Sequence, residues 1–345
     1  MKIHEKYINR CLELAKKGLG YTYPNPLVGS VIVYNGKIIG EGWHHQAGLA
    51  HAEVNAINVV KDTSLLEKAT LYVNLEPCSH YGKTPPCSDL IIEKGIKHVV
   101  IGTTDPFAKV AGRGIQKLLN AGCQVTVGVL EEACNEVNKR FFTFHKHKRP
   151  YIILKWAETN DGFIAPEHQE IGKPFWITSA AAKQLVHQWR SQEAGILIGT
   201  NTALKDNPKL DTRLWYGKSP VKIILDQTLK VPKQANVFTG EKTLCIIGNK
   251  TTPPTNANHH AIDFSKNLAT QVCKIAYTEE IQSIIIEGGK QTLQTFIDEN
   301  LWDEARVFTG KTMLHKGIKA PILQSVAAYK TNLSTDELTF YKNKY

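Results

Sequence analysis

The chain has 345 residues and a mass of 38.5 kDa, a length that favours two domains over one or three. Hydrophobic residues make up 42% and charged residues 21% of it, which excludes a mainly disordered protein. The net charge of +10 is spread over the chain without a basic tail, so it fits a small phosphorylated substrate as well as a nucleic acid. No apolar stretch reaches the ~18–20 residues that a membrane span requires.

The N-terminal segment 1–18 alternates charged and apolar residues, and it has neither the apolar core nor the cleavage site of a secretory signal. We therefore expect a cytoplasmic protein. Its seven cysteines are an odd number scattered along the chain, which is not a disulfide framework. In a reducing compartment the question becomes which cysteines bind metal.

The first half of the chain alternates predicted helices and strands. Periodicity predicts an amphipathic helix over 3–17, and Asn35-Gly36 predicts a hairpin between two strands. The further elements expected in this half are helices over 51–60, 88–94 and 112–120 and strands over 71–76, 98–102 and 124–129. This alternation predicts a three-layer α/β/α domain.

The basic run 145–149 marks the best candidate boundary, and we expect domains over 1–147 and 148–345. Beyond it the α/β pattern restarts with no sign of an internal repeat, which predicts a second, different α/β domain. The expected elements are strands over 151–157, 194–200, 221–226, 243–248 and 283–286, a helix around 179–192 and a polar loop over 249–260.

The strongest chemical signal is His51-Ala52-Glu53 followed by Pro77-Cys78 and Pro86-Cys87. One imidazole and two thiolates give tetrahedral zinc three ligands and leave the fourth position to water, whose pKa the metal lowers. The nearby carboxylate of Glu53 would carry the proton from this water to a leaving amine. This is the pattern of the zinc nucleobase deaminases.

Two other interpretations of these residues stay open. Each residue could be an ordinary capping or packing residue. Alternatively, they could form a structural zinc site closed by a fourth protein ligand, for which His80 lies near enough in sequence. A histidine that opens a helix and a cysteine that ends a strand favour the open, catalytic site.

The loop CSHYGKTPPC is longer than the Cys-x-x-Cys of nucleobase and cytidine deaminases. With PNPLVGSVIV before it and Asp105-Pro106 and AGRG after it, it resembles the bifunctional riboflavin-biosynthesis proteins, in which a pyrimidine deaminase is fused to a reductase. The resemblance implies a domain similar in fold to cytidine deaminase. This domain would replace the C2 amine of 2,5-diamino-6-ribosylamino-4(3H)-pyrimidinone 5′-phosphate by oxygen and release ammonia.

The same resemblance implies roles for single residues of this half. Its zinc ligands would be His51, Cys78 and Cys87, and Glu53 would move the protons. The implied contacts to the pyrimidine substrate are Asn25, His44, His80, Lys83 and Asp105.

The second half has no G-x-G-x-x-G, the fingerprint of the usual nicotinamide-binding fold. It has instead IIIEGGKQTLQTF (284–296), a buried strand, two glycines and a helical pattern. Paired glycines let a backbone approach a ligand closely, and a helix N-terminus attracts phosphate.

The segments LKWAETNDGFIA, PFWITS, WRSQEAGILIGTNTALKDNPKLDTR and IIEGGKQT resemble, in order and spacing, the reductase half of the same family. The resemblance implies a fold similar to dihydrofolate reductase and NADPH-dependent reduction of the ribosyl to a ribityl chain. The implied cofactor contacts are Glu158, Trp176, Thr202, Asp206, Gln227, Gly289, Lys290, Gln291, Thr292, Leu293, Gln294 and Thr295. The implied substrate contacts are Pro174, Arg190, Leu210, Arg213 and Glu287. Three of these residues, Glu158, Pro174 and Gln227, differ from the types that the family often carries.

We therefore expect a bifunctional enzyme with one zinc ion and NADPH, a phosphorylated pyrimidine as substrate, and no nucleic-acid or membrane partner. Strand edges in the second half favour a homo-oligomer. One alternative is a single-activity nucleoside or nucleic-acid deaminase whose second domain only binds substrate, which would not bind NADPH. Another is a non-enzymatic zinc module, in which Glu53→Ala would have no chemical consequence.

Overall fold

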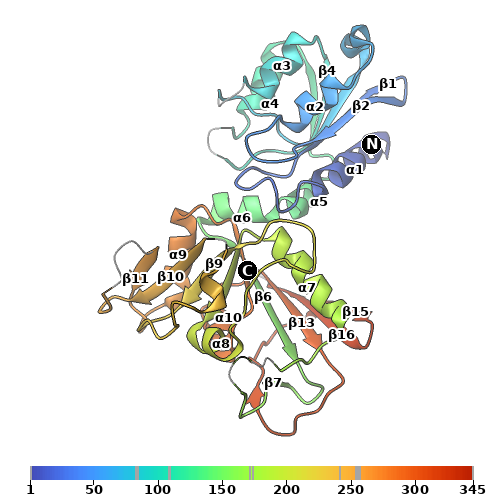
Figure 1. The fold of residues 1–345 in the computed structure, drawn as a ribbon. Coiled ribbons are helices and arrows are strands. Elements are labelled where there is room, and N and C mark those ends of the chain that lie inside the picture. Colours follow the sequence, from blue (N-terminus) through green and yellow to red (C-terminus); the bar gives the residue numbers. More distant parts are fainter. Residues whose placement is uncertain are drawn as a thin grey trace. The chain divides into compact units, whose positions relative to one another are not determined.

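The computed structural model describes residues 2–81, 85–107, 110–170, 172, 175–240, 242–252 and 258–343 (Figure 1). The chain divides into two compact units, Met1–His147 and Lys148–Tyr345. Each unit has its own sheet and its own hydrophobic cores. Within the described residues, no helix combines the length and the apolar character that crossing a membrane requires.

The first unit is built around a five-stranded sheet of order β2-β1-β3-β4-β5. Strand β1 pairs antiparallel with β2 and β3, whereas β3, β4 and β5 run parallel. The elements in chain order are α1 (Lys2–Lys16), β1 (Gly29–Tyr34), β2 (Lys37–Trp43), α2 (Ala52–Asn58), η1 (Thr63–Lys68), β3 (Thr70–Leu75), α3 (Cys87–Glu93), β4 (His98–Thr103), α4 (Arg113–Asn120), β5 (Gln124–Val127), α5 (Glu131–Val137) and α6 (Lys139–His147).

Helices cover both faces of this sheet because successive strand residues point to opposite sides. On one face α2, α3 and α4 pack over Ile32, Val73 and Ile101. On the other face α1 and α5 pack over Val31 and Val100. The three-layer α/β/α arrangement that the alternating pattern predicts is therefore confirmed (Figure 1).

The second unit contains a nine-stranded sheet of order β11-β10-β9-β8-β12-β6-β13-β16-β15 and a small sheet of β14 and β7. The strands from β11 to β13 run parallel, and β16 and β15 add antiparallel at one edge. The elements in chain order are β6 (Tyr151–Glu158), β7 (Phe163–Ala165), α7 (Ala180–Gln192), β8 (Gly195–Gly199), α8 (Thr200–Asp206), β9 (Val221–Leu225), η2 (Asn236–Phe238), β10 (Thr243–Gly248), β11 (His259–Ile262), α9 (Leu268–Thr278), β12 (Ser283–Ile286), α10 (Lys290–Asp298), β13 (Glu304–Thr309), β14 (Ile318–Lys319), β15 (Ala327–Leu333) and β16 (Asp336–Lys342).

Both faces of the large sheet are also covered. Helices α9 and α10 pack over the face that includes Ile284 and Ile286, and α7 and α8 pack over the face that includes Ile285. A strand buried on both faces explains the continuous apolar run at β12. The second α/β domain expected from the sequence is thus confirmed as a separate sheet with its own two cores.

The structure contains elements that the sequence pattern did not predict, among them α5, α8, α9, β13, β15 and β16, and it differs from the expectation in two further segments. The polar loop expected over 249–260 ends earlier, because His259 and His260 begin β11 and pair with β10. The basic run begins inside a helix that the sequence pattern did not predict, since α6 reaches His147. Its buried Phe141 and Phe142 pack with Leu75. The burial of these aromatic side chains, rather than the basic charge, therefore explains why this segment is structured.

Candidate functional site

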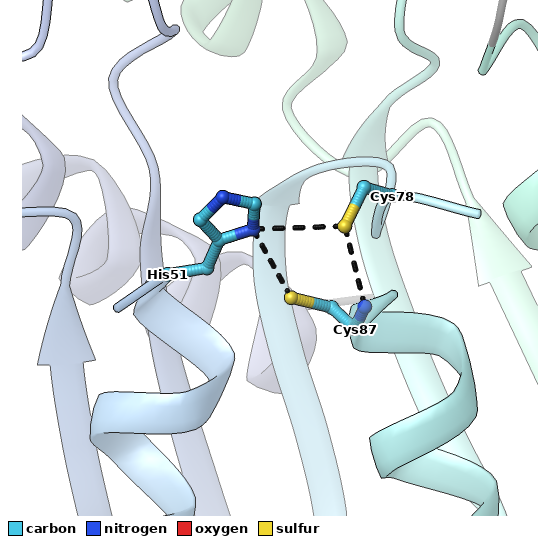
Figure 2. A group of neighbouring side chains, drawn as sticks. All are labelled: His51, Cys78 and Cys87. Atoms are coloured by element: carbon cyan, nitrogen blue, oxygen red, sulfur yellow. Dashed lines mark hydrogen bonds between the residues drawn. The ribbon is translucent and has the colours of Figure 1, made fainter. Parts of the chain in front are cut away.

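The three predicted metal ligands come together at the carboxyl end of the parallel strands of the first unit (Figure 2). Cys78 follows β3, His51 precedes α2, and Cys87 is the first residue of α3. His51 Nδ1 lies 3.3 Å from Cys87 Sγ and 3.6 Å from Cys78 Sγ. The backbone N–H of Cys87 donates to Cys78 Sγ at 3.2 Å, which ties the two cysteine segments to each other.

The donor set fits a catalytic zinc ion. The ligand atoms all lie within 4.8 Å of one another, and no fourth His, Cys, Asp or Glu in the described part of the chain joins the group. His80 is exposed, and its ring lies 6.2 Å from that of Phe107. One imidazole and two thiolates with an open position are typical of catalytic zinc, so the closed structural site with His80 as a ligand is not supported.

The protonation of the ligands also fits a cation. A hydrogen bond from Cys87 lowers the pKa of Cys78 to about 4, while the pKa of Cys87 itself is raised by that same bond and by burial. The hydrogen bond with Cys78 also raises the pKa of His51, to about 9. A zinc ion would hold both sulfurs as thiolates.

Glu53 lies in the first turn of α2, two residues after His51, and is 3% exposed. Burial raises the pKa of its carboxyl group, and a hydrogen bond with the Cys87 thiol opposes this shift. A carboxyl group with a raised pKa gives up its proton less readily, which suits a group that both accepts and donates one. The proton-transfer role of Glu53 stays a prediction.

Two predicted substrate contacts lie beside His51. The His44 and His51 rings are 5.3 Å apart in an edge-to-face arrangement, and Asn25 Nδ2 lies 3.0 Å from His44 Nε2. Burial lowers the pKa of His44. The contact of these two residues with substrate stays a prediction.

Of the other predicted substrate contacts in this unit, Asp105 follows β4 and is 8% exposed. Burial raises its pKa to about 7, and the nearby charges of Glu76 and Cys78 act in the same direction. Lys83 lies outside the described residues.

Glu76, for which no role was predicted from the sequence, organises the loop after β4 and the first turn of α4. Its buried carboxylate accepts four backbone N–H groups, from Asp105 and Gly112 on Oε2 and from Gly114 and Ile115 on Oε1, at 2.9–3.3 Å. A Cβ on Gly114 would stand 2.1 Å from the Pro77 carbonyl oxygen, so the first turn of α4 packs directly on the segment that carries Cys78. The signal in the sequence is an acidic residue directly before Pro77-Cys78.

In the second unit, the predicted strand, glycine pair and helix are present. Strand β12 ends at Ile286, and Gly289, with φ of 47°, caps the start of α10. A Cβ on Gly289 would lie 3.3 Å from Thr202 Oγ1, so these two predicted cofactor contacts lie together. The N-terminal turns of α8 and α10 therefore lie next to each other at the same edge of the sheet.

A buried ion-pair cluster adjoins this edge. Arg190 donates through Nε and Nη2 to the two carboxylate oxygens of Glu287, at 2.9 and 2.8 Å. Lys155 Nζ lies 3.7 Å from Glu287 Oε2. Burial by itself would raise the pKa of Glu287. The positive charges of Arg190 and Lys155 outweigh this effect and lower the pKa to about 2. The planar fork of Arg190, a predicted substrate contact, binds Glu287 here.

The other predicted cofactor contacts are spread over several elements. Glu158 ends β6 and accepts a hydrogen bond from Trp156 Nε1 at 2.8 Å, and Asp206 ends α8 and accepts one from Gln169 at the same distance. Trp176 is 56% exposed, with Lys183 Nζ 3.4 Å from its ring centroid. These contacts stay predictions.

For the remaining predicted residues the structure limits what the side chain can do. Leu210 and Leu293 pack in the two cores of this unit, which leaves only their backbones for a ligand. Gln227 is exposed, Arg213 is exposed and paired with Asp211, and Pro174 lies outside the described residues. The others, Lys290, Gln291, Thr292, Gln294 and Thr295, belong to the first six positions of α10.

Two titratable residues of the cluster were missed by the sequence analysis. Lys155 is the one charged side chain in the apolar strand segment YIILKWA, which was the available signal. His187 lies one turn before Arg190 on α7 and is 2% exposed. Burial and the charges of Arg190 and Arg213 lower its pKa to about 4.

Two family models match the chain. The model described as RibD C-terminal domain matches residues 150–339, and the one described as cytidine and deoxycytidylate deaminase zinc-binding region matches residues 1–103. The riboflavin biosynthesis protein RibD of Aquifex aeolicus is 40% identical, over 99% of each chain. That of Bacillus amyloliquefaciens is 39% identical, over 98% of this chain and 92% of the relative.

Solved structures with both halves are similar to this chain over its whole length. The diaminohydroxyphosphoribosylaminopyrimidine deaminase/5-amino-6-(5-phosphoribosylamino)uracil reductase of Thermotoga maritima has a TM-score of 0.88 and 36% identity, over 99% of each chain. Acinetobacter baumannii RibD has a TM-score of 0.87 and 29% identity, over 100% of this chain and 99% of the other.

We predict that Glu76→Gln loosens the loop after β4. The amide nitrogen of glutamine would face two of the four backbone donors, and each buried donor left without a partner costs about 1–3 kcal/mol. Hydrogen exchange measured by mass spectrometry should therefore become faster in the peptide around Gly112 to Ile115, and zinc should be lost more readily on dialysis. The control is Glu67→Gln, at an exposed position of η1; equal exchange rates in the two variants would contradict the role of Glu76.

We predict that Glu287→Gln destabilises the second unit at pH 7 by about 3 kcal/mol, because Arg190 and Lys155 lose their buried counter-charge. The pKa of Glu287 is lowered from 4.5 to about 2 in the folded chain. The unfolded chain therefore takes up the proton first as the pH falls, and the stabilisation is full above about pH 4.5 and lost toward pH 2. Urea unfolding at pH 7 and pH 3 should show the difference between wild type and variant shrinking. Glu167→Gln, which removes the exposed pair with Lys316, should change little at either pH.

Proposed function

This chain belongs to the RibD family of bifunctional riboflavin-biosynthesis enzymes, and from this we propose which unit and which residues carry each of its two activities. It is a zinc-dependent deaminase and an NADPH-dependent reductase. We assign the deaminase to residues 1–147 and the reductase to residues 148–345. The observation that carries the assignment is the convergence of His51, Cys78 and Cys87 beside the buried Glu53.

The deaminase would act on 2,5-diamino-6-ribosylamino-4(3H)-pyrimidinone 5′-phosphate. Zinc bound by His51, Cys78 and Cys87 would supply a water molecule of lowered pKa. Glu53 would take a proton from this water as its oxygen forms the bond to C2, and would return it to the amine as the C2–N bond breaks. The buried position of Glu53 supports this, because a raised pKa lets one carboxyl group serve in both steps.

The reductase would act on the deaminated product. NADPH would supply a hydride to C1′ of the ring-opened ribose, giving 5-amino-6-ribitylamino-2,4(1H,3H)-pyrimidinedione 5′-phosphate. Glu287 would contact the substrate, and Arg190 and Lys155 would hold its carboxylate in place. Gly289 and the first turn of α10 would lie against the cofactor phosphates, which a helix N-terminus attracts.

A single-activity deaminase with a passive second unit is not favoured. The reductase-domain model matches residues 150–339, which is nearly all of that unit. The non-enzymatic zinc module is not favoured either, because it does not explain why a buried carboxyl group, that of Glu53, lies beside the ligands.

We predict that Glu53→Gln abolishes deamination, with kcat lower by at least ~100-fold, because the amide cannot carry a proton. Ammonia release and NADPH oxidation from the diaminopyrimidinone ribosylphosphate should both be lost. NADPH oxidation from the deaminated intermediate should be unchanged, which also shows that the variant is folded and that deamination comes first. Ammonia without NADPH consumption in the wild type, even from the deaminated intermediate, would count against the reductase assignment.

We further propose that the chain works in the cytoplasm as a homo-oligomer, without a nucleic-acid or membrane partner. All seven cysteines are free, which suits a reducing compartment. The outermost strand β15 presents five exposed residues in a row, next to Val326, which is 83% exposed. An exposed strand edge is a surface on which a second copy can pair.

We predict that light scattering gives the wild type a mass that is a multiple of 38.5 kDa. A charge at the β15 edge would be costly to bury, so Val326→Asp should shift the mass toward the monomer. Leu49→Asp, at a position that is 56% exposed in the first unit, should not do so. A monomeric wild type would rule out the homo-oligomer.

A further inference from the structure

Lys183 and Trp176 form a cation–π pair at the start of α7. Lys183 Nζ lies 3.4 Å from the centroid of the Trp176 ring, and in the described part of the chain no carboxylate pairs with it. An ammonium group is attracted by the negative face of an indole. The Trp176 side chain is nevertheless 56% exposed. Since the ammonium covers one face of the ring, the opposite face is the surface on which a flat ligand ring can stack.

The backbone beside this pair is held at two points. A Cβ on Gly310 would stand 2.3 Å from the Ile177 carbonyl oxygen, so the residue after Trp176 packs directly on the segment that follows β13. The Ser179 N–H donates to Asp336 Oδ2 at 2.8 Å, and the Ser179 side chain caps α7. The segment that carries the indole is therefore fixed, and the ammonium restrains the orientation of the ring itself.

The pair stands at the edge of the sheet where we place the cofactor. The Gly310 N–H donates to the Glu158 carbonyl at 2.9 Å, so the Trp176 segment lies at the carboxyl ends of β13 and β6. Strand β6 is also the neighbour of β12, which leads to Gly289 and α10. From β12 to β13 is two strand spacings, about 10 Å. Phosphates at Gly289 and a ring at Trp176 are therefore within the reach of one NADPH molecule.

A ring at Trp176 would also lie near the proposed substrate. Lys183, His187 and Arg190 stand at positions i, i+4 and i+7 of α7, which places them on one face of the helix. Lys183 and Arg190 are about 10 Å apart along the helix axis, at ~1.5 Å per residue. Arg190 binds Glu287, the proposed substrate contact. The nicotinamide ring of NADPH gives the hydride and must lie beside the substrate, so it is the cofactor ring that belongs at Trp176.

We infer that Lys183 is a positioning residue of the reductase, which holds the Trp176 indole so that its free face stacks on the nicotinamide ring of NADPH. The inference rests on the proposed reductase function and adds how the reacting ring is held. Lys183 acts through the indole and does not touch the cofactor.

The charge of Lys183 has a consequence for the two redox states of the cofactor. The nicotinamide ring is neutral in NADPH and positively charged in NADP⁺. With ring atoms in contact at ~3.5 Å, a ring stacked on the indole lies about 7 Å from the Lys183 ammonium. Two positive charges at that distance repel each other. Lys183 therefore favours the reduced cofactor over the oxidised product.

The test is NADPH oxidation by the zinc-loaded full chain with the deaminated intermediate, with NADP⁺ as an inhibitor. Lys183→Met keeps the aliphatic chain and removes the charge. We expect the KM for NADPH to rise about fivefold, the size of one cation–π contact. The inhibition constant of NADP⁺ should stay near the wild-type value, because lost repulsion offsets lost stacking, so the ratio of this constant to the KM falls about fivefold. Lys183→Arg should keep both constants, since a guanidinium group also stacks on an indole.

Two results with Lys183→Met would overturn the inference. Equal weakening of NADPH and NADP⁺ would do so, because a general structural defect acts on both cofactor forms alike. A rise in the KM of the pyrimidine with no change in that of NADPH would do so as well, because Lys183 would then contact the substrate.

Trp176→Leu tests whether Lys183 acts through the indole. In that background Lys183→Met should leave the KM for NADPH unchanged, and a further rise would overturn the inference, since Lys183 would then have a contact of its own. The matched control is Lys17→Met, because Lys17 Nζ lies 4.6 Å from the Trp43 ring centroid in the first unit. It should change neither constant.

Failure of the inference and failure of the proposed reductase give different results. A wild type that does not oxidise NADPH with the deaminated intermediate would overturn the proposed reductase and this inference with it. An active wild type whose constants do not respond to Lys183→Met would overturn this inference alone.

Discussion

A buried carboxylate directly after a central parallel strand is the constraint on which both units depend. Glu76 follows β3, the middle strand of the first sheet, and Glu287 follows β12, the middle strand of the second. A buried charge must be compensated, and each unit does so differently. Glu76 accepts four backbone N–H groups, whereas Glu287 binds the side chains of Arg190 and Lys155.

The difference suits the chemistry beside each carboxylate. The backbone N–H groups compensate the charge of Glu76 without a positively charged side chain next to Cys78. Within the described residues, no such side chain therefore competes with a metal cation for the two sulfurs. At the other site, Arg190 and Lys155 place positive charge at the edge of the sheet where α8 and α10 begin. A phosphorylated substrate and a phosphate-bearing cofactor both suit such an environment. Glu158 accepts a hydrogen bond from Trp156.

The first unit also shows how side-chain amides build a site from loops. Asn74 and Asn138 hold the segment at Leu27, and Asn55 holds the carbonyl before His51. Each of these amides satisfies backbone groups that a loop would otherwise bury without partners. Most of the ligands and their neighbours lie outside helices and strands. These hydrogen bonds tie their loops to the helices and strands nearby, which holds the loops in place.

The sequence by itself predicted the two α/β units, most helices and strands of the first unit up to β5, and the grouping of His51, Cys78 and Cys87. Period-two and helical patterns are local, and His51, Cys78 and Cys87 stand in a motif whose chemistry needs those residue types. Tertiary structure alone decided that Lys155, 132 positions before Glu287 in the chain, is its partner, that Glu76 gathers the loop after β4, and that Leu210 and Leu293 pack in cores. These contacts depend on which strands become neighbours in the sheet. Strand order is a long-range property that no local pattern records, because it is set by packing across the whole unit.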